Sequence, residues 1–462
     1  MSDIPHDPAP PVPGPRADRT PATKMLFAML IAAMLAVPLF TVYLLVYDRQ
    51  NQSKTAQSSI AEGWGGPQVV AGPLLVIPYL AQTTETVSEG GKQVTKTGTV
   101  WRALSLTPDT AEITSEVKPD TRHRSIYEVV VYEARNTGTA RFSLPADLSR
   151  YGVTREALAL DRAELRFGVS DARGLFGAPP AVKLDGKPLD LQPGKGPRET
   201  GGSGFYTTLD ASMLAAQPFT VAYDYQVRGN GSLALAPQGG DTTWKVRSAW
   251  PNPSYQGDLL PAKHAEGKDG FNAEWRVGNL ALGRALVSTG DTEPAQITGG
   301  EMPGVFQARV NLVTPVDVYD QVNRSVKYGF LFIGFTFMAF LMFDLIGGAR
   351  VSPIELGLVG AGLVLFFVML LAFAEVVGFM LAYVIAAGAT IGLLTAYSSA
   401  VLGSRLRAGF IAALLTALYG VLYVLLSLEA YSLLIGSLLL FAALAAVMYL
   451  TRSLDWGGRK IA

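Results

Sequence analysis

The sequence predicts an α+β membrane protein with six transmembrane helices, one N-terminal and five C-terminal, and a large β-rich periplasmic domain that is sandwich-like. Hydrophobic residues make up 49% of the chain and gather at its two ends, whereas most charged residues lie in the middle. The apolar blocks are about 20 residues long, which is enough to cross about 30 Å of hydrocarbon at about 1.5 Å per residue. The middle of the chain instead shows short runs of alternating apolar and polar residues, the pattern of strands.

The N-terminal end combines a polar arm with the first apolar block. Residues 1–24 contain seven prolines and no periodic apolar pattern, so we expect a disordered cytoplasmic arm. Residues 25–47 are the first predicted transmembrane helix. A cleaved signal peptide is the alternative, but the block is longer than a typical signal core and no small-x-small cleavage site follows it directly. The sequence therefore favours an uncleaved signal anchor.

Five further apolar blocks lie within residues 328–450. The only Lys or Arg residues in this region are Arg350, Arg405 and Arg407. Short connections between the blocks predict that sequential helices are antiparallel neighbours. Residues 451–462 are a predicted cytoplasmic tail. The five predicted helices are residues 328–346, 356–374, 379–397, 406–426 and 431–450.

Basic residues set the predicted orientation, because Lys and Arg gather on the cytoplasmic side of membranes. With the N-terminus inside, this side holds Lys24, Arg350 and Arg452 among others, while the short loops near 375–378 and 427–430 contain no Lys or Arg. The sequence thus predicts a multi-pass membrane protein, and in a two-membrane bacterium this membrane is the inner (plasma) membrane. Both termini are expected in the cytoplasm and residues 48–327 in the periplasm.

Residues 48–327 form the predicted β-rich domain. Every second residue of 219–227 is apolar, and Gly-Asn-Gly at 229–231 is a turn signal. The stretch 193–204 is rich in Pro and Gly, and it either divides the region into two domains or forms one long loop. The predicted strands are residues 69–80, 99–106, 126–133, 163–169, 220–227 and 242–250.

Composition and motifs exclude several classes of function. The absence of cysteine excludes disulfides and thiolate chemistry, and a net formal charge of zero gives no reason to expect a nucleic-acid partner. The sequence has no phosphate-binding Gly-rich loop and no nucleophile elbow. His123 and His264 are far apart in the sequence, so we expect no metal site. The sequence therefore predicts a protein that is not an enzyme and has no cofactor.

A charged turn follows the predicted strand 163–169. Its sequence is Asp171-Ala172-Arg173-Gly174. One interpretation is a turn in which the Asp171–Arg173 ion pair is structural and Gly174 adopts a positive φ. The other is a ligand clamp, with Asp171 and Arg173 as candidate interaction residues. The structural interpretation is favoured.

An aromatic and proline-rich segment, Trp250-Pro251-Asn252-Pro253-Ser254-Tyr255, precedes Asp258. Proline removes donors from a strand ladder, so the segment is not expected within a sheet. It is either an ordered loop whose rings pack on the sandwich or an exposed recognition surface. Packing is favoured, and Trp250, Tyr255 and Asp258 are candidate interaction residues.

Charged residues among the C-terminal helices lie near helix ends. Asp344 is expected to pair with Arg350 at the cytoplasmic side, an interfacial pair of little energetic value. Glu375 and Glu429 lie on the opposite side, which makes them candidate docking residues for the β-rich domain. Because a charge at the bilayer centre usually marks a translocation path, this pattern disfavours an ion-coupled carrier.

An ordered series of short motifs runs from Gly66 to Trp456. It comprises Gly72-Pro73-Leu74-Leu75-Val76-Ile77-Pro78-Tyr79, Asp171-Ala172-Arg173-Gly174, Trp250-Pro251-Asn252-Pro253-Ser254-Tyr255-Gln256-Gly257-Asp258 with Leu260-Pro261, Thr314-Pro315-Val316-Asp317 with Tyr319, Arg324 with Lys327-Tyr328, Leu358-Val359-Gly360, Glu375, and Thr451-Arg452 with Asp455-Trp456. The series resembles the CreD family of bacterial inner-membrane proteins. The resemblance implies one large periplasmic domain and a link to cell-envelope integrity, with regulation alongside a two-component system and tolerance to a colicin in some bacteria. It implies no reaction and no catalytic residues.

Topology, missing catalytic motifs and the resemblance together predict a non-enzymatic inner-membrane protein that supports cell envelope integrity through its periplasmic domain. The alternative is a transporter, or a protein that handles lipids or envelope precursors, using the C-terminal helical bundle. An enzyme acting on envelope polymers is a third class, and it requires His123, His264 or an acidic pair to meet in a cleft. The expected partners are the lipid bilayer and another envelope protein or a cell-wall component, and no nucleic acid.

Overall fold

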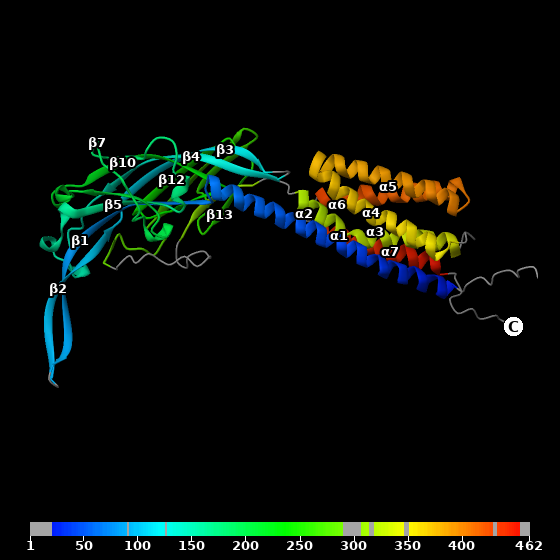
Figure 1. The fold of residues 1–462 in the computed structure, drawn as a ribbon, viewed down its shortest axis with the longest axis horizontal. Coiled ribbons are helices and arrows are strands. Elements are labelled where there is room, and N and C mark those ends of the chain that lie inside the picture. The colour runs from blue at the N-terminus through cyan, green and yellow to red at the C-terminus, as the bar shows by residue number, and fades with distance from the viewer. Residues whose placement is uncertain are drawn as a thin grey trace, which may run out of the picture. The chain divides into compact units, whose positions relative to one another are not determined.

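The computed structural model describes residues 21–89, 92–124, 127–289, 306–313, 318–345, 351–427 and 432–452. The chain divides into two compact units, which we call the helical unit (residues 1–52 and 316–462) and the β unit (residues 53–315). Helix α1 (Pro21–Trp64) contributes residues to both units. The protein is therefore α+β, with a large β-rich domain and several apolar helices, as predicted (Figure 1).

One sheet of the β unit, called sheet A, has the strand order β13-β17-β11-β1-β5-β9-β8, with β2 paired to β1 and β16 paired to β2. Its pairs are antiparallel except for β1 with β11, which is parallel. The strands of sheet A are β1 (Gln68–Glu89), β2 (Lys92–Leu106), β5 (Ala163–Val169), β8 (Gln192–Pro193), β9 (Gly204–Leu209), β11 (Ser232–Ala236), β13 (Pro253–Gly257), β16 (Val287–Ser288) and β17 (Ala308–Leu312).

The other sheet, called sheet B, has the order β14-β15-β12-β3-β4-β10-β6-β7. Its pairs are antiparallel except for β12 with β3. The strands of sheet B are β3 (Thr110–Arg124), β4 (Tyr127–Phe142), β6 (Ala181–Leu184), β7 (Lys187–Pro188), β10 (Phe219–Asn230), β12 (Asp241–Ser248), β14 (Lys263–Gly267) and β15 (Gly270–Gly278).

The two sheets share one hydrophobic core. Along β10, Val221, Tyr223, Tyr225 and Val227 are buried and alternate with more exposed residues, so one face of the strand turns inward. Phe167 of sheet A meets Tyr223 of sheet B edge to face, with ring centroids 5.3 Å apart. Burial of apolar faces from both sheets is the main stabilising contribution in such a sandwich.

All six predicted strands overlap observed strands, namely β1, β2, β4, β5, β10 and β12. The predicted strand 242–250 extends two residues beyond the end of β12. The stretch 193–204 forms a loop that contains the 3₁₀ turn η5 (Arg198–Thr200). Core residues before and after this loop belong to one cluster, so it does not divide the β unit.

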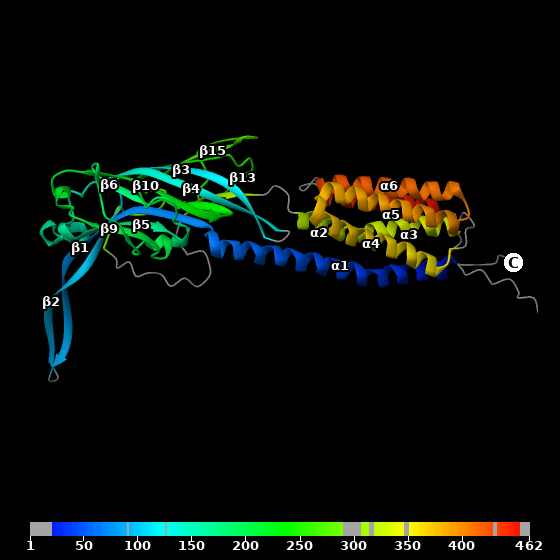
Figure 2. The ribbon, with the colours of Figure 1, turned by 45° about the horizontal axis from the view of Figure 1, so that its top comes forward.

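Strands β1 and β2 continue beyond sheet A as a two-stranded ribbon (Figures 1 and 2). Within the described residues, 81–89 of β1 and 92–100 of β2 pair only with each other. Leu80 and Trp101 face each other at the base of the ribbon and are 44% and 52% exposed. The ribbon therefore presents open strand edges beside exposed apolar side chains.

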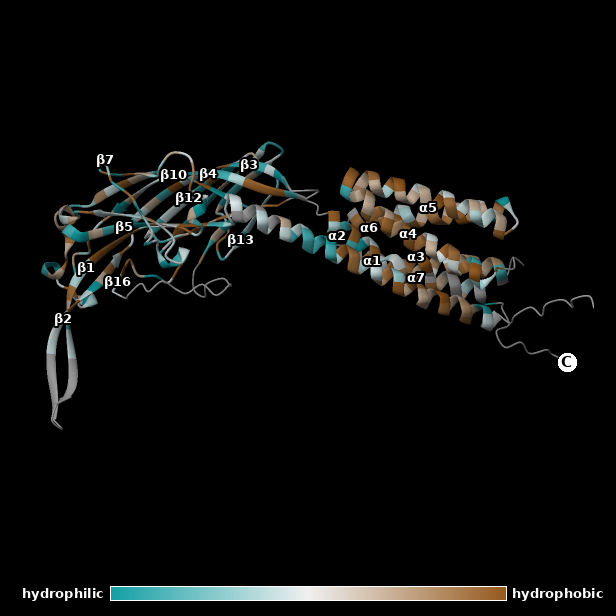
Figure 3. Ribbon diagram, viewed as in Figure 1, coloured by the Kyte–Doolittle hydropathy of each residue, from teal (hydrophilic) through white to brown (hydrophobic). Residues whose placement is uncertain are grey.

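The helical unit contains most of the apolar helices, and Figure 3 shows their predominantly hydrophobic colouring. Ser352 and Glu355 form a capping box that starts α4, with Pro353 at the first helical position. Gly378, with φ of 79°, separates α4 from α5. The remaining helices are α2 (Val318–Lys327), α3 (Gly329–Leu345), α4 (Pro353–Val377), α5 (Phe379–Val401), α6 (Arg405–Ser427) and α7 (Ser432–Thr451).

Four helical segments among the described residues are long and apolar enough to cross a membrane: Thr23–Ala56, Pro353–Val377, Phe379–Val401 and Arg405–Leu426. Helices α2 and α3, which meet at 40°, make a fifth if they count as one bent span. Helix α7 covers the sixth predicted span but is not among these five. The count of six spans therefore stays a prediction.

The domain limits differ from the predicted 48–327 at both ends. Helix α1 continues to Trp64 because the residues after position 47 are mostly good helix formers, with no Gly or Pro before Gly63. Residues 318–327 form helix α2 and group with the helical unit. Tyr319, Val322 and Val326 are buried along one stripe of α2, which is helical rather than strand periodicity. The predicted disordered arm lies almost entirely outside the described residues.

Candidate functional site

The first candidate site lies in the β unit where α1 gives way to β1. Helix α1 ends at Trp64, and Gly65 follows with φ of 126°. A Cβ at Gly65 would lie 2.7 Å from the carbonyl oxygen of Arg228, so only glycine fits both the dihedral and the space. The chain then enters β1 at Gln68. We call Trp64, Gln68, Asp171, Arg173 and Arg228 the junction cluster.

Asp171 caps the 3₁₀ turn η4 (Ala172–Gly174) that follows β5. Its carboxylate accepts two bonds from the Arg173 guanidinium, from Nε and Nη2, each 2.9 Å long. It also accepts from the backbone N–H groups of Arg173 (3.1 Å) and Gly66 (3.2 Å). The Arg173 side chain, with these N–H groups, holds the pKa of Asp171 below its usual value. Both carboxylate oxygens are occupied, which favours the structural interpretation over a ligand clamp.

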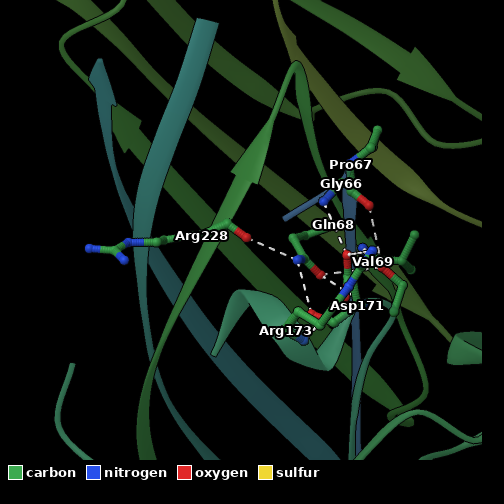
Figure 4. A network of polar contacts seen from close by, with 8 residues as sticks. Gly66, Pro67, Gln68, Val69, Asp171, Arg173 and Arg228 are labelled. Carbon is green, nitrogen blue, oxygen red and sulfur yellow. Dashed lines mark hydrogen bonds and ion pairs between the residues drawn. The ribbon is translucent and has the colours of Figure 1, made fainter. Parts of the chain in front are cut away.

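Gln68 is fully buried and links three parts of the chain (Figure 4). Its side-chain amide donates to the carbonyl oxygens of Asp171 (3.2 Å) and Arg228 (2.9 Å). Its side-chain carbonyl accepts from the backbone N–H of Asp171 (3.2 Å) and from the Ser170 hydroxyl (3.3 Å). One side chain therefore ties the start of β1 to the turn after β5 and to β10.

Gly174 does not adopt the positive φ that the sequence analysis predicts, and it is instead the last residue of η4. A Cβ at Gly174 would collide with the carbonyl oxygen of Arg228 and with the side-chain nitrogen of Gln68. The glycine is needed because β10 and Gln68 approach the turn closely, and not because of its backbone dihedral.

Trp64 fixes the end of α1 by cation–π contacts. The guanidinium carbons of Arg228 and Arg122 lie 4.3 and 4.5 Å from the centroid of the Trp64 ring. Arg228 also lies 4.2 Å from the Phe176 ring and pairs with Glu133 at 2.9 Å. These contacts reach β3, β4 and β10 of sheet B, so the junction cluster joins α1 to both sheets.

The second candidate, the Trp250–Asp258 segment, contains an edge strand, β13, where the sequence analysis expects a loop. Strand β13 is the last strand of sheet A and pairs with β17. The Tyr255 ring packs against Phe271 and Trp275 at centroid distances of 6.2 and 5.8 Å. The Trp250 indole N–H donates to the carbonyl of Val313 at 2.9 Å. These contacts support packing over recognition for Trp250 and Tyr255.

Among the three candidate residues of this segment, Asp258 is the exposed one. Its carboxylate accepts from the backbone N–H of Gln307 at 3.0 Å, so it closes the connection between β13 and the segment that precedes β17. This bond gives Asp258 a structural role and leaves part of its carboxylate exposed.

The third candidate, Glu375, lies near the end of α4 within the helical unit. Its carboxylate is 3.8 Å from the Arg49 guanidinium of α1 and accepts from the Tyr319 hydroxyl of α2 at 3.2 Å. Next to it, Gln50 of α1 donates to Asp320 of α2 at 3.1 Å. Glu375 thus joins three helices of the bundle. Glu429, the other predicted docking residue, lies outside the described residues.

A second ion pair joins the other end of the membrane part of α1 to the bundle. Lys24 pairs with Asp344 of α3 at 3.0 Å, and Asp344 also accepts from the backbone N–H of Val351 at 3.4 Å. The observed partner of Asp344 is therefore Lys24, whereas the sequence analysis predicts Arg350, which lies outside the described residues. The Asp344 side chain is only 7% exposed, so this pair is better shielded than a surface pair.

The two histidines of the β unit do not come together. His123 lies near the end of β3, 3.6 Å from Glu128. His264 lies on β14 and contacts the Tyr255 ring. Among the described residues, no three His, Asp or Glu side chains are arranged to hold a metal ion.

Gln68, Trp64 and Arg228 are the residues of the junction cluster that the sequence analysis does not identify. Gln68 lies 103 residues from Asp171 and 160 residues from Arg228, so no local pattern connects them. The one local signal is Gly65-Gly66 directly after Trp64, which predicts a break in the chain direction.

A family model and a curated relative both match this chain over most of its length. The family model described as "Inner membrane protein CreD" matches residues 20–457. Inner membrane protein CreD of Escherichia coli (strain K12) is 32% identical over 431 residues, which cover 92% of this chain and 91% of that protein.

Solved structures give only weak similarity. The M1 zinc metallopeptidase of Deinococcus radiodurans aligns over 78% of this chain and 95% of its own, with 9% identity and a TM-score of 0.21. A mutant of that enzyme bound to a Tyr-Ser-Ala substrate aligns over 48% of this chain and 53% of its own, with 7% identity and a TM-score of 0.22. Similarities at this level carry no argument about fold or activity.

Proposed function

Because this chain belongs to the CreD family of inner membrane proteins, we propose that it supports the integrity of the bacterial cell envelope without catalysing a reaction. In this proposal the protein crosses the inner membrane six times, both termini are cytoplasmic, and the β unit lies in the periplasm. The partner of the β unit is another envelope protein or a cell-wall component.

The observation that carries the membrane part of the proposal is the pair of ionic contacts along α1. Lys24 pairs with Asp344 and Arg49 pairs with Glu375. Lys24 and Arg49 are 25 positions apart in the sequence, which corresponds to about 37 Å of helix at about 1.5 Å per residue. This length matches a hydrocarbon core of about 30 Å with an interfacial layer at each end. No charged residue lies between Lys24 and Asp48.

The basic residues support the orientation. Sequential helices α4, α5 and α6 follow one another through short turns, so the turn before α6, with Arg405 and Arg407, falls at the same end of the bundle as Lys24. Arg452 follows α7. At the other end, the basic residue Arg49 is paired with Glu375. The basic residues Lys24, Arg405, Arg407 and Arg452 thus favour the end that holds Lys24 as the cytoplasmic end.

A non-enzymatic role is supported by the internal contacts that the candidate side chains make. Asp171 is saturated by internal donors, Glu375 joins helices, and Asp258 closes a connection. In helices α3 to α6 the charged groups lie near the helix ends, which also argues against the alternative of an ion-coupled transporter.

The proposal is tested with a strain that lacks the gene. We expect the deletion to raise sensitivity to detergents, envelope-active drugs and osmotic shock, and plasmid-borne wild-type protein to restore resistance. A Glu375→Gln variant, which weakens the contact between α1 and α4, is expected to restore less than the wild type at equal protein level. A deletion strain as resistant as its parent in all three challenges would refute the envelope role.

A further inference from the structure

The core of the β unit contains a chain of polar side chains that the proposed function does not use. The Trp244 indole N–H of β12 donates to the Ser115 hydroxyl of β3 at 2.9 Å. This hydroxyl donates to the side-chain oxygen of Asn136 on β4 at 2.7 Å. All three side chains are fully buried. We call Trp244, Ser115 and Asn136 the core polar chain.

The direction of these hydrogen bonds fixes the orientation of the Asn136 amide. Ser115 accepts from Trp244, whose indole nitrogen can only donate, so the hydrogen of the Ser115 hydroxyl is available for Asn136. The reverse amide orientation would make Ser115 accept twice and leave its hydrogen without an acceptor in the described core. Asn136 therefore presents its oxygen to Ser115. Its side-chain nitrogen, Nδ2, has no hydrogen-bond partner among the described residues.

The Tyr223 hydroxyl of β10 is a second buried polar group of this kind. Tyr223 is 5% exposed, and its hydroxyl has no hydrogen-bond partner from the described part of the chain. Burial holds the pKa of Tyr223 well above its usual value. The hydroxyl therefore keeps its hydrogen and can both donate and accept.

The strand register brings the two groups near each other. Tyr223 lies opposite Gly138, which is two positions after Asn136 on the same face of β4. The Tyr223 hydroxyl occupies the space that a side chain at Gly138 would fill. Two positions on a strand are about 6.6 Å apart, and two hydrogen bonds of about 2.8 Å through one water span up to about 5.6 Å. The Asn136 side chain is long enough to cover the difference.

We propose that one ordered water molecule is bound in the core of the β unit, where it accepts from Asn136 Nδ2 and donates to the Tyr223 hydroxyl. The backbone carbonyl oxygen of Glu112 lies beside the same space over Gly138, and a carbonyl has two lone pairs. It can accept the second hydrogen of the water, which gives the water the three partners that are typical of buried waters. Buried polar side chains nearly always have a partner, and this water supplies it.

The surroundings favour water over a larger ligand. The rings of Phe167 and Tyr225 pack against the Tyr223 ring at centroid distances of 5.3 and 6.0 Å. The polar atoms thus lie among packed aromatic rings. Water is the smallest molecule that both donates and accepts hydrogen bonds, so it satisfies both groups with the least space.

This inference goes beyond the proposed envelope role, because it concerns the folded β unit and is measured on purified protein without any phenotype. The direct test is a crystal structure of the full chain at a resolution that shows buried waters. We expect density for one water within hydrogen-bond distance of Asn136 Nδ2 and the Tyr223 hydroxyl. A direct bond between these two groups, no density between them, or density too large for one water would overturn the proposal.

The Tyr223→Phe variant tests the same water through stability. It removes only the hydroxyl, and we expect the Tm of the full chain in detergent micelles to fall by about 2–4 °C, as for one lost hydrogen bond in a domain of this size. The matched control is Tyr132→Phe, which removes a fully buried hydroxyl that donates to the Ser232 carbonyl at 2.6 Å and should cause a similar fall. A Tm that stays the same or rises in Tyr223→Phe would show a hydroxyl without a partner and overturn the proposal.

A double variant tests whether Tyr223 and Asn136 share the water. In an Asn136→Leu background the water has lost one of its partners, so Tyr223→Phe is expected to lower the Tm by less than half as much as in the wild type. An equal fall in both backgrounds would show that the Tyr223 hydroxyl acts independently of Asn136, which contradicts a shared water.

Discussion

Replacing Gln68 by leucine tests the junction cluster most sharply. The side chain is fully buried and makes four hydrogen bonds, two to the backbone of Asp171, one to the carbonyl of Arg228 and one to Ser170. Leucine has a similar size but makes none of them. The backbone N–H of Asp171 then loses its acceptor, and the two carbonyl groups lose a donor.

The expected cost follows from these groups. A buried polar group left without its partner costs about 1–3 kcal/mol, so Gln68→Leu is expected to destabilise the β unit by about 3 kcal/mol. For a domain of this size that is a fall of roughly 6–12 °C in Tm. The β unit draws its stability from one core and both sheets, so this loss should appear as a shift of the whole transition.

The assay is thermal unfolding of the full chain in detergent micelles, followed by the β-sheet signal in circular dichroism. The control is Gln82→Leu, the same change at an exposed position of the same strand. The control is expected to shift Tm by less than about 1–2 °C, as surface substitutions do. A Gln68→Leu protein that melts within this range of the wild type would refute the role assigned to the cluster.

Three other predictions concern single contacts. Gly360→Leu should destabilise the helical unit by about 1–3 kcal/mol. A Cβ at this position would collide with Leu35 of α1 and lie 2.9 Å from the Phe337 ring. The temperature of heat-induced aggregation in detergent micelles measures this loss of stability. Glu375→Gln should cost about 1–2 kcal/mol in the same assay, since Arg49 loses its carboxylate. Asp171→Asn should flatten the acid side of the stability curve of the β unit, measured as urea midpoints between pH 7 and pH 3. The pKa of Asp171 is lower in the folded than in the unfolded chain, so its contribution is present above the unfolded value of 3.8 and is lost as the pH falls through the folded value.

Each of these predictions has a control or a contradicting result. A Cβ at Gly392 meets no atom within 4 Å, so Gly392→Leu should leave the aggregation temperature unchanged, and an equal loss in both glycine variants would contradict close packing at Gly360. Glu156 is exposed on the β unit. Glu156→Gln, the control for Glu375→Gln, should therefore leave the aggregation temperature unchanged. An Asp171→Asn protein with the same acid dependence as the wild type would show that the carboxylate contributes nothing to the folded state.

Elements with a strong local period could be predicted from the sequence. The apolar blocks became α1 and α3–α7, and the alternating runs became strands of both sheets, because burial of one face or of a whole helix leaves its period in the sequence. Helix α2 was missed because it is short and largely polar. Its buried residues Tyr319, Val322 and Val326 form a stripe that is visible only at helical spacing.

The prediction that prolines keep residues 250–258 out of a sheet was wrong for β13. Pro253 is the first residue of β13, and β13 is an edge strand. Proline is tolerated at both kinds of position, since its missing N–H costs the sheet nothing there. The sequence excluded the interior of a sheet correctly, but it did not exclude a sheet edge.

The junction cluster could be predicted only in part. Asp171 and Arg173 are two residues apart, so their ion pair is a local property that the sequence shows. Gln68 and Trp64 act on partners that only the completed fold brings near. The need for glycine at position 174 was recognised, but its cause is the approach of Arg228 and not a dihedral angle.

The central claim, that the β unit lies outside the cytoplasm while the helical unit crosses the membrane, is tested most directly by labelling single cysteines. The chain has no cysteine of its own, so each introduced thiol is the sole target. Thr220→Cys places a thiol at an exposed position of β10, and Ser404→Cys places one in the turn before α6. In spheroplasts treated with a membrane-impermeant maleimide, we predict labelling at position 220 and none at position 404 until the membrane is opened. Labelling at 404 with protection at 220 would contradict the account.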